Sequence, residues 1–186
     1  MNPENYKMLH HYNTPGHAHE LTFSCYHKRE YLRDSTACNL LLAELQKARE
    51  EHQFKLWAYV CMPDHVHALL WPLNTAYSIA KILNDVKGRM VKEYRDYVLS
   101  NKPDLFNRFA FVDNSKKRTV FRFWQAGGGF DRNFRDARAI YNSIRYIELN
   151  PVKKGLAATP EEYRWSSAWA RKRNEGLVPD RFNQPL

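Results

Sequence analysis

Two apolar, aromatic-rich runs that lie only three residues apart restrict the possible folds of this chain most strongly. The runs cover residues 54–61 and 65–71, and Met62-Pro63-Asp64 separates them. Each run has the length of a strand rather than of a helix, and a Pro-Asp step favours a turn. The pattern therefore predicts an antiparallel hairpin with two largely buried strands.

The segments around this hairpin predict alternating strands and helices. Residues 21–26 alternate apolar with polar side chains, the period of a half-buried strand, and residues 121–125 predict a further strand. Three segments carry apolar residues at helical spacing, at about 35–52, 79–90 and 134–150, the last ended by Pro151. The resulting order predicts an α+β fold of the ferredoxin-like kind, an antiparallel sheet with helices packed on one face.

The charge balance favours an anionic partner. Lys and Arg number 29 against 20 Asp and Glu, which gives a net charge of +9. Such a surface attracts polyanions, so nucleic acid is the first candidate, although many basic proteins bind none. Three widely spaced cysteines without a CxxC pair predict reduced, mostly buried thiols.

No apolar run approaches the ~18 residues that a membrane-crossing helix needs. With no secretory leader recognised at the start of the sequence, we expect a cytoplasmic, nucleoid-associated protein.

His65 and His67 lie two residues apart in a predicted strand, so both imidazoles project from the same face of the sheet. Two adjacent nitrogen ligands favour a metal site, while hydrogen-bonded structural histidines are the simpler alternative. Apolar neighbours make the strand nearly buried, and buried histidines need partners for their ring nitrogens. The pair is therefore a candidate metal site.

The third predicted helix supplies a candidate nucleophile. Its apolar residues are Ala137, Ile140, Tyr141, Ile144 and Ile147. With a step of about 100° per residue, Tyr146 lies almost opposite the centre of that face. Asn142 and Asn150 lie one turn before and after it. A phenol and two carboxamides are thus expected along one edge of the helix.

Two motifs in this order resemble a known family. CMPDHVH at residues 61–67, followed by an apolar run, and YIELNPV at residues 146–152, followed by YRWSS at 163–167, are similar to the single-tyrosine HUH transposases. Among these, the chain resembles the REP-associated tyrosine transposases most. The resemblance extends from the strand at His19 to about Ser167.

The resemblance implies a ferredoxin-like HUH nuclease fold and a metal-dependent transposase and endonuclease. By resemblance, Tyr146 is the catalytic nucleophile that forms a 5′-phosphotyrosine and leaves a free 3′-hydroxyl for later joining. His65, His67 and Asn150 would bind Mg²⁺ or Mn²⁺, although many relatives carry Gln or Glu where this chain has Asn150. The implied substrate is single-stranded DNA with a hairpin formed by palindromic repeats, cleaved by a monomer or homodimer.

Basic and aromatic side chains outside the motifs are candidates for contacts with DNA. Phosphate contacts are predicted for Lys81, Lys87, Arg89, Lys116, Lys117 and Arg118. Exposed aromatics such as Tyr12 or Trp124 are candidates for stacking on bases. The sequence identifies no general base for Tyr146.

Three other functions compete with this hypothesis. A non-catalytic nucleic-acid-binding module would use His65 and His67 structurally, a zinc hydrolase lacks an evident third strong ligand, and a relaxase is disfavoured by the short chain. We expect an N-terminal arm at residues 1–18, a catalytic domain at 19–152 and a C-terminal extension with a basic tail at 153–186.

Overall fold

The structure is a computed structural model, and it describes residues 12–113 and 117–183. Its strands and α-helices, in chain order, are β1 (Ala18–Ser24), α1 (Ser35–Glu51), β2 (Phe54–Cys61), β3 (His65–Pro72), α2 (Ile79–Asn101), β4 (Ala110–Asp113), β5 (Arg118–Phe121), β6 (Phe130–Phe134), α3 (Ala137–Lys153) and α4 (Ser167–Arg173). Short 3-10 helices lie between them, namely η1 (Tyr26–Lys28), η2 (Tyr31–Arg33), η3 (Pro103–Arg108) and η4 (Pro160–Glu162).

The main sheet has four strands in the order β2-β3-β1-β6, and each neighbouring pair is antiparallel. The predicted hairpin at residues 54–71 is present as β2 and β3. Together with α1 and α2, these strands follow the βαββαβ order of ferredoxin-like folds. The predicted α+β class and antiparallel sheet are confirmed.

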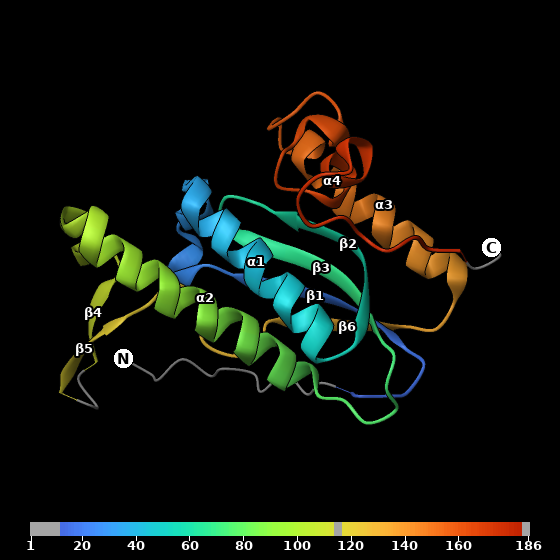
Figure 1. The fold of residues 1–186 in the computed structure, drawn as a ribbon, viewed down its shortest axis with the longest axis horizontal. Helices are drawn as coiled ribbons and strands as arrows, with labels where there is room; N and C mark the ends of the chain where they lie inside the picture. The colour runs from blue at the N-terminus through green and yellow to red at the C-terminus, as the bar shows by residue number, and fades with distance from the viewer. Residues whose placement is uncertain (1–11, 114–116, 184–186) are drawn as a thin grey trace.

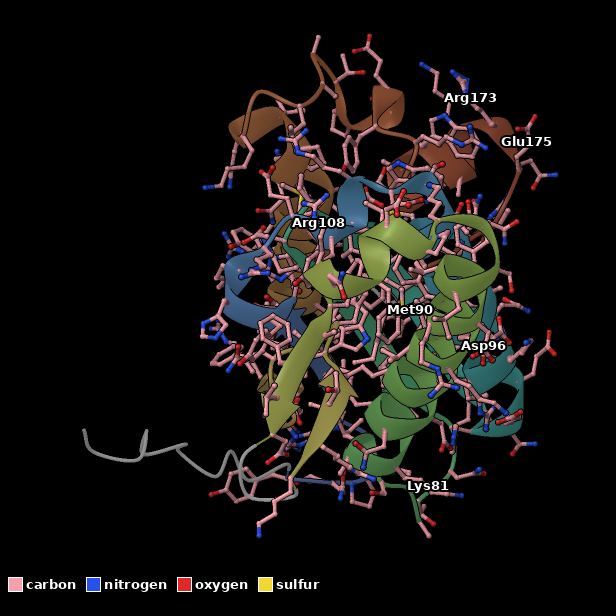
Figure 2. All side chains as sticks on the ribbon, turned by 90° about the vertical axis from the view of Figure 1, so that its left-hand side faces the viewer. Lys81, Met90, Asp96, Arg108, Arg173 and Glu175 are labelled. Atoms are coloured by element: carbon pink, nitrogen blue, oxygen red, sulfur yellow. The ribbon has the colours of Figure 1, made fainter. Side chains whose placement is uncertain are left out.

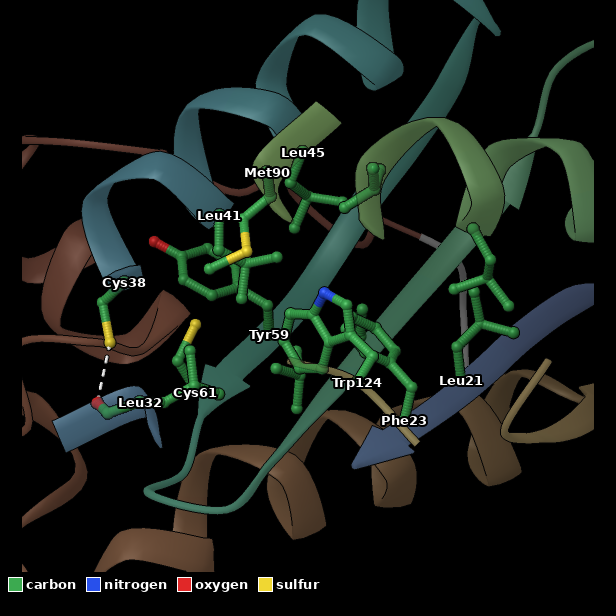
Figure 3. Close-up of a cluster of buried hydrophobic side chains, with 14 of the residues drawn as sticks. Leu21, Phe23, Leu32, Cys38, Leu41, Leu45, Tyr59, Cys61, Met90 and Trp124 are labelled. Atoms are coloured by element: carbon green, nitrogen blue, oxygen red, sulfur yellow. Dashed lines mark hydrogen bonds between the residues drawn. The ribbon is translucent and has the colours of Figure 1, made fainter. Parts of the chain in front are cut away.

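Helices α1 and α2 lie side by side on one face of the sheet (Figure 1). The main hydrophobic core fills the space between them and the strands, and includes Leu21, Phe23, Leu41, Tyr59 and Met90. Figure 3 shows these side chains meeting between the helices and the sheet. All three cysteines are free and buried here, as predicted.

The opposite face of the sheet is covered by α3, so the helices do not all lie on one face. A second hydrophobic cluster joins Ile140, Ile144 and Ile147 of α3 to Val60 and Leu69 of the sheet. Because β2 and β3 carry apolar residues on both faces, the sheet needs a helical layer on each side. The second layer brings α3 to the face of β3 that carries the two histidines.

The strand predicted at 121–125 is displaced. β5 ends at Phe121, and Phe123 and Trp124 are buried, so Trp124 does not lie exposed for stacking on bases. The fourth strand of the main sheet is β6, which has β1 as its one neighbour. Its sequence, Phe-Asp-Arg-Asn-Phe, is polar at the centre, which hides the usual strand pattern. Arg132 is exposed there, whereas the Asp131 side chain is buried and lies 2.9 Å from Nδ1 of His19.

The helix predictions hold with changes at the ends. Helix α1 covers the predicted segment, and Asp34 is its N-cap through a 2.8 Å bond from the Thr36 N–H. Helix α2 runs on to Asn101. Helix α3 continues past Pro151 to Lys153, because one missing N–H in the last turn is tolerated where the proline ring is buried.

The described helices include none that is long and apolar enough to cross a membrane.

Candidate active site

His65 and His67 share one face of β3, directly opposite two hydroxyl side chains of β1. The sheet register pairs His65 with Ser24 and His67 with Thr22. The two imidazole rings stand nearly perpendicular, with centroids 4.9 Å apart. The side-by-side arrangement predicted from their spacing is therefore present.

Each histidine uses its Nδ1 atom for a hydrogen bond within the protein. Nδ1 of His65 lies 2.6 Å from Oδ1 of Asp64, and Nδ1 of His67 lies 2.8 Å from Oγ1 of Thr22. A metal-binding histidine normally uses its other ring nitrogen for such a bond, which fixes the orientation of the ring. The pair thus leaves two Nε2 atoms for a divalent ion, and the donor set fits a metal site.

The environment of His67 keeps its imidazole neutral. Burial lowers the pKa of His67 to about 4, with smaller contributions from the nearby positive charges of His65 and Lys28. Neutral imidazole is the form that binds a metal ion, so at neutral pH no proton has to be displaced.

Tyr146 lies beside the histidine pair rather than on the far side of its helix. Its ring centroid is 5.7 Å from that of His67, at an interplanar angle of 80°. The wheel prediction was inaccurate here, since Tyr141 is 41% exposed and Ser143 and Asn150 are buried. The inner face of α3 is therefore turned toward Ser143 and Asn150, and Tyr146, 44% exposed, lies on its flank next to His67 of β3.

Two side chains that follow on α3 contact Tyr146, one at its backbone and one at its ring. The Asn150 amide donates through Nδ2 to the Tyr146 carbonyl at 3.0 Å. No hydrogen bond within the described part of the chain engages its Oδ1, an oxygen that can accept from a ligand or bind a metal ion. The Lys153 ammonium lies over the Tyr146 ring, 4.9 Å from its centroid. A cation at this position favours negative charge near the phenol.

The C-terminal segment fixes α3 from its other side. Glu148 accepts hydrogen bonds from Ser167 Oγ at 2.6 Å and from the Arg171 guanidinium at 3.2 Å. The Tyr163 hydroxyl donates to the Cys61 carbonyl at 2.8 Å. The second motif, at residues 146–167, thus joins α3 to the end of β2.

Glu20 and Ser143 belong to this region but were missed by the sequence analysis. Glu20 is buried on β1 and accepts a 2.9 Å hydrogen bond from Ser143 Oγ on α3. The signal was the alternation of Glu20, Thr22 and Ser24 along one side of the strand. The predicted strand began at residue 21, which excluded Glu20.

The last glycine of the run Gly127-Gly128-Gly129 has a packing role. Gly129 has φ +74°, and a Cβ atom there would lie 2.2 Å from the Thr22 carbonyl oxygen. Only glycine permits such a close approach to the strand that holds His67 in place.

A second group of possible metal ligands, Glu51, His52 and Asp85, lies at the C-terminal end of α1. Both carboxylate oxygens of Glu51 accept bonds from the Arg89 guanidinium, at 2.8 and 2.6 Å. His52 Nε2 lies 2.8 Å from Asp85 Oδ2. A guanidinium already provides the positive charge at this group, so the histidine pair on β3 is the better candidate for a metal ion.

The residues predicted to contact phosphates do not form one patch. Lys81 is exposed near the N-terminal end of α2, far from Arg108, which follows the other end of the helix (Figure 2). Arg89 is paired with Glu51. Lys87 donates to the Gly127 carbonyl at 2.9 Å, and burial lowers its pKa to about 8. Lys117 and Arg118 are exposed at the β4–β5 hairpin, while Lys116 lies outside the described residues. Their contacts with DNA remain predictions.

Comparison with known proteins identifies the family. The profile of the IS200-like transposases matches residues 15–120, more than half of the chain. The chain belongs to the IS200-like transposase family. This transposase is 27% identical over 143 residues to a Haemophilus influenzae protein provisionally named a REP-associated tyrosine transposase, covering 75% of this chain and 72% of that protein.

A solved structure gives the same fold. The transposase resembles a REP-associated tyrosine transposase bound to a REP hairpin, with a TM-score of 0.65 and 16% identity, over 96% of this chain and 93% of that one. The resemblance to this group that the two sequence motifs indicated is confirmed.

Proposed function

We propose that this transposase cleaves and rejoins single-stranded DNA, with Tyr146 as the nucleophile and with His65, His67 and Asn150 as the ligands of Mg²⁺ or Mn²⁺. The main support is the position of Tyr146, whose ring lies 5.7 Å from His67 of the same chain. A reactive phenol beside two oriented imidazoles is the arrangement that metal-assisted phosphoryl transfer requires.

The phosphodiester is a poor electrophile because its anionic oxygens repel an incoming nucleophile. A divalent ion, when bound, withdraws charge from the phosphate and aligns it. His65 and His67 are held for this task by Asp64 and Thr22, so little reorganisation accompanies binding. The Oδ1 atom of Asn150, one turn after Tyr146, offers a third, neutral ligand.

Tyr146 Oη attacks the scissile phosphorus, a new O–P bond forms, and the bond from phosphorus to the 3′ oxygen breaks. The phenol loses its proton, and the departing 3′ oxygen takes one up to become a hydroxyl. The resulting 5′-phosphotyrosine conserves the phosphoester, so attack by a 3′-hydroxyl reverses the step and joins strands. The Lys153 ammonium, 4.9 Å from the Tyr146 ring centroid, favours the negative charge carried by the reacting oxygens.

The tyrosine acts within its own subunit in this proposal. Helix α3 is attached to its own sheet by Ile144 and Ile147, by the Ser143 to Glu20 bond and by the bonds of Glu148 to the C-terminal segment. A partner subunit is not needed to bring Tyr146 to His67.

The proposed substrate is single-stranded DNA that carries a hairpin. The net charge of +9 suits a polyanion, and the structural relative of the same fold is bound to a REP hairpin. The cleavage site in this proposal lies in the single strand next to such a hairpin and meets the exposed side of Tyr146.

The test is covalent adduct formation with end-labelled, hairpin-forming DNA taken from the sequence that flanks the gene. Wild-type protein with Mn²⁺ should give an adduct that resists denaturing electrophoresis, and EDTA should prevent it. Tyr146→Phe should give none, whereas the control Tyr141→Phe, on an exposed part of the same helix, should react like the wild type.

Binding without an adduct under every metal condition would contradict the proposal. That result would favour a non-catalytic DNA-binding module in which the two histidines are structural.

A further inference from the structure

A pocket of about 450 Å³ opens next to Tyr146, between the edge of the sheet and the N-terminal half of α3. We call it the Glu20 pocket, and its lining includes Glu20, Arg132, Phe134, Asn142, Ser143 and Tyr146. Its volume lies in the range of pockets that hold small molecules or single bases. It begins beside the nucleophile on the side that points away from His65.

The floor of the Glu20 pocket is a buried carboxylate with unused hydrogen-bonding capacity. Glu20 is 8% exposed, and Oε2 accepts one bond, from Ser143 Oγ at 2.9 Å. A carboxylate can accept about four hydrogen bonds. Within the described part of the chain, the Glu20 side chain has no other hydrogen-bond partner and no ion pair. A buried acceptor that faces a pocket in this state is suited to a ligand with N–H donors.

The nearest cation does not neutralise Glu20. Arg132 stands directly opposite Glu20 in the register of β1 and β6, yet its guanidinium lies over the Phe134 ring, 4.8 Å from the centroid. The Arg132 guanidinium is exposed, and it is paired with no carboxylate among the described residues. It can therefore bind a phosphate at the mouth of the pocket. The pocket therefore offers a cation at its mouth, an aromatic wall and an acid at its floor.

Of the four DNA bases, guanine matches this floor. Its N1–H and N2–H groups are adjacent donors and fit the two oxygens of one carboxylate. Adenine and cytosine present a single amino group beside a ring nitrogen acceptor, which a second carboxylate oxygen would repel. Thymine presents one N–H between two carbonyls. The geometry of a carboxylate thus selects guanine.

We propose that the Glu20 pocket binds one unpaired guanine of the substrate, next to the phosphate that Tyr146 attacks, with Glu20 accepting from N1–H and N2–H. The proposal rests on the DNA-cleaving function proposed above and adds a rule for where cleavage occurs. Base recognition beside the nucleophile would place a defined phosphodiester at Tyr146. The hairpin would supply affinity, and the guanine would supply the register.

The experiment uses the hairpin substrate with randomised nucleotides on either side of the single-stranded junction. Binding is measured with the Tyr146→Phe protein, which cannot cleave, and adducts are measured with the wild type. We expect guanine to be enriched at one position in both assays. Replacing that guanine by inosine, which lacks the N2 amino group, should weaken binding roughly tenfold, in the range expected for a bidentate contact to a base. Replacement by 7-deazaguanine, which keeps both donors, should have no effect.

Glu20→Gln, made in the Tyr146→Phe protein, tests the residue. It has nearly the same shape but offers one acceptor and one donor, so the ratio of guanine to inosine binding should fall to about one. Glu93→Gln, an exposed acid of α2, is the matched control and should keep the wild-type ratio. The inosine comparison needs no variant at position 20, so it stands even if Glu20→Gln does not fold.

Two results would overturn the guanine pocket while leaving the proposed function intact. One is adduct formation with no base preference at any position. The other is a guanine preference that survives Glu20→Gln. If the Glu20→Gln single variant keeps this preference and loses only adduct formation, Glu20 acts in the chemistry of Tyr146 instead. Failure of the proposed function itself would appear separately, as the absence of adducts with every oligonucleotide and metal.

Discussion

The bond between Thr22 and His67 allows a sharp test of the proposed metal site. Thr22 Oγ1 lies 2.8 Å from His67 Nδ1 and fixes the ring so that Nε2 is available to the ion. Thr22→Val has the same shape and suits a strand equally well, but it removes the hydroxyl. Thr22→Ser keeps a hydroxyl at the same position and is the matched control.

The loss of a hydrogen bond that orients a metal ligand typically lowers metal affinity or activity by about 10- to 100-fold, or about 1.4–2.7 kcal/mol. His67 is 7% exposed, so water does not easily replace the lost partner, and the larger end of this range applies. The free energy of unfolding should fall by about 1–3 kcal/mol, because Nδ1 of His67 is left in a buried position without a hydrogen-bond partner.

Titration of Mn²⁺ into the protein, followed by electron paramagnetic resonance of the free ion, measures the affinity directly. The rate of adduct formation as a function of Mn²⁺ concentration gives a second measure. We expect Thr22→Val to need more Mn²⁺ in both assays and Thr22→Ser to resemble the wild type. If Thr22→Val bound Mn²⁺ as tightly as the wild type, the argument that Thr22 orients a metal ligand would be refuted.

Three further predictions follow from particular contacts. Gly129→Ala should lower the free energy of unfolding by about 1–3 kcal/mol in chemical denaturation, because its Cβ would lie 2.2 Å from the Thr22 carbonyl oxygen. Gly127→Ala, also at positive φ but with open space around it, should lower it less. Equal losses would speak against the close contact as the cause. Mn²⁺ at about 100 times its dissociation constant should stabilise the protein by about 2.7 kcal/mol in thermal unfolding. His67→Ala should abolish this stabilisation and His52→Ala should not. The opposite result would place the ion at Glu51, His52 and Asp85. The folded-state pKa of Lys87, about 8, lies below its unfolded value of 10.5, so the unfolded chain binds more protons between these two pH values. The free energy of unfolding therefore rises with pH across that window, and the stability gained from neutral Lys87 is lost as pH falls through 8. Because Lys87 is partly exposed, Lys87→Met should remove about 1–2 kcal/mol of this pH-dependent change in stability. Lys92→Met, at an exposed position of the same helix, should keep the wild-type slope of stability against pH. An unchanged slope in Lys87→Met would show that Lys87 titrates normally.

Most of the fold could be predicted because local patterns agree with the tertiary structure. The hairpin at 54–71 and the first two helices have strong periodicity and lie where they were expected, since their apolar sides face one core. The prediction failed at β6 and at residues 121–125. There, burial depends on neighbours that are distant in the sequence, and Phe123 and Trp124 enter the core without forming a regular strand of the main sheet.

The candidate site divides in the same way. The spacing of His65 and His67 by itself placed both imidazoles on one face, because side chains alternate along a strand, and the two motifs indicated Tyr146. Only the tertiary structure decided that α3 crosses this face, that Thr22 and Asp64 orient the rings, and that Glu20 reaches Ser143 on α3 near Tyr146. Glu20 and Ser143 are 123 positions apart in the chain, and no local pattern encodes which residues meet when a helix packs on a sheet. Local periodicity determines the face on which a side chain lies, and the packing of whole elements determines which side chains it meets there.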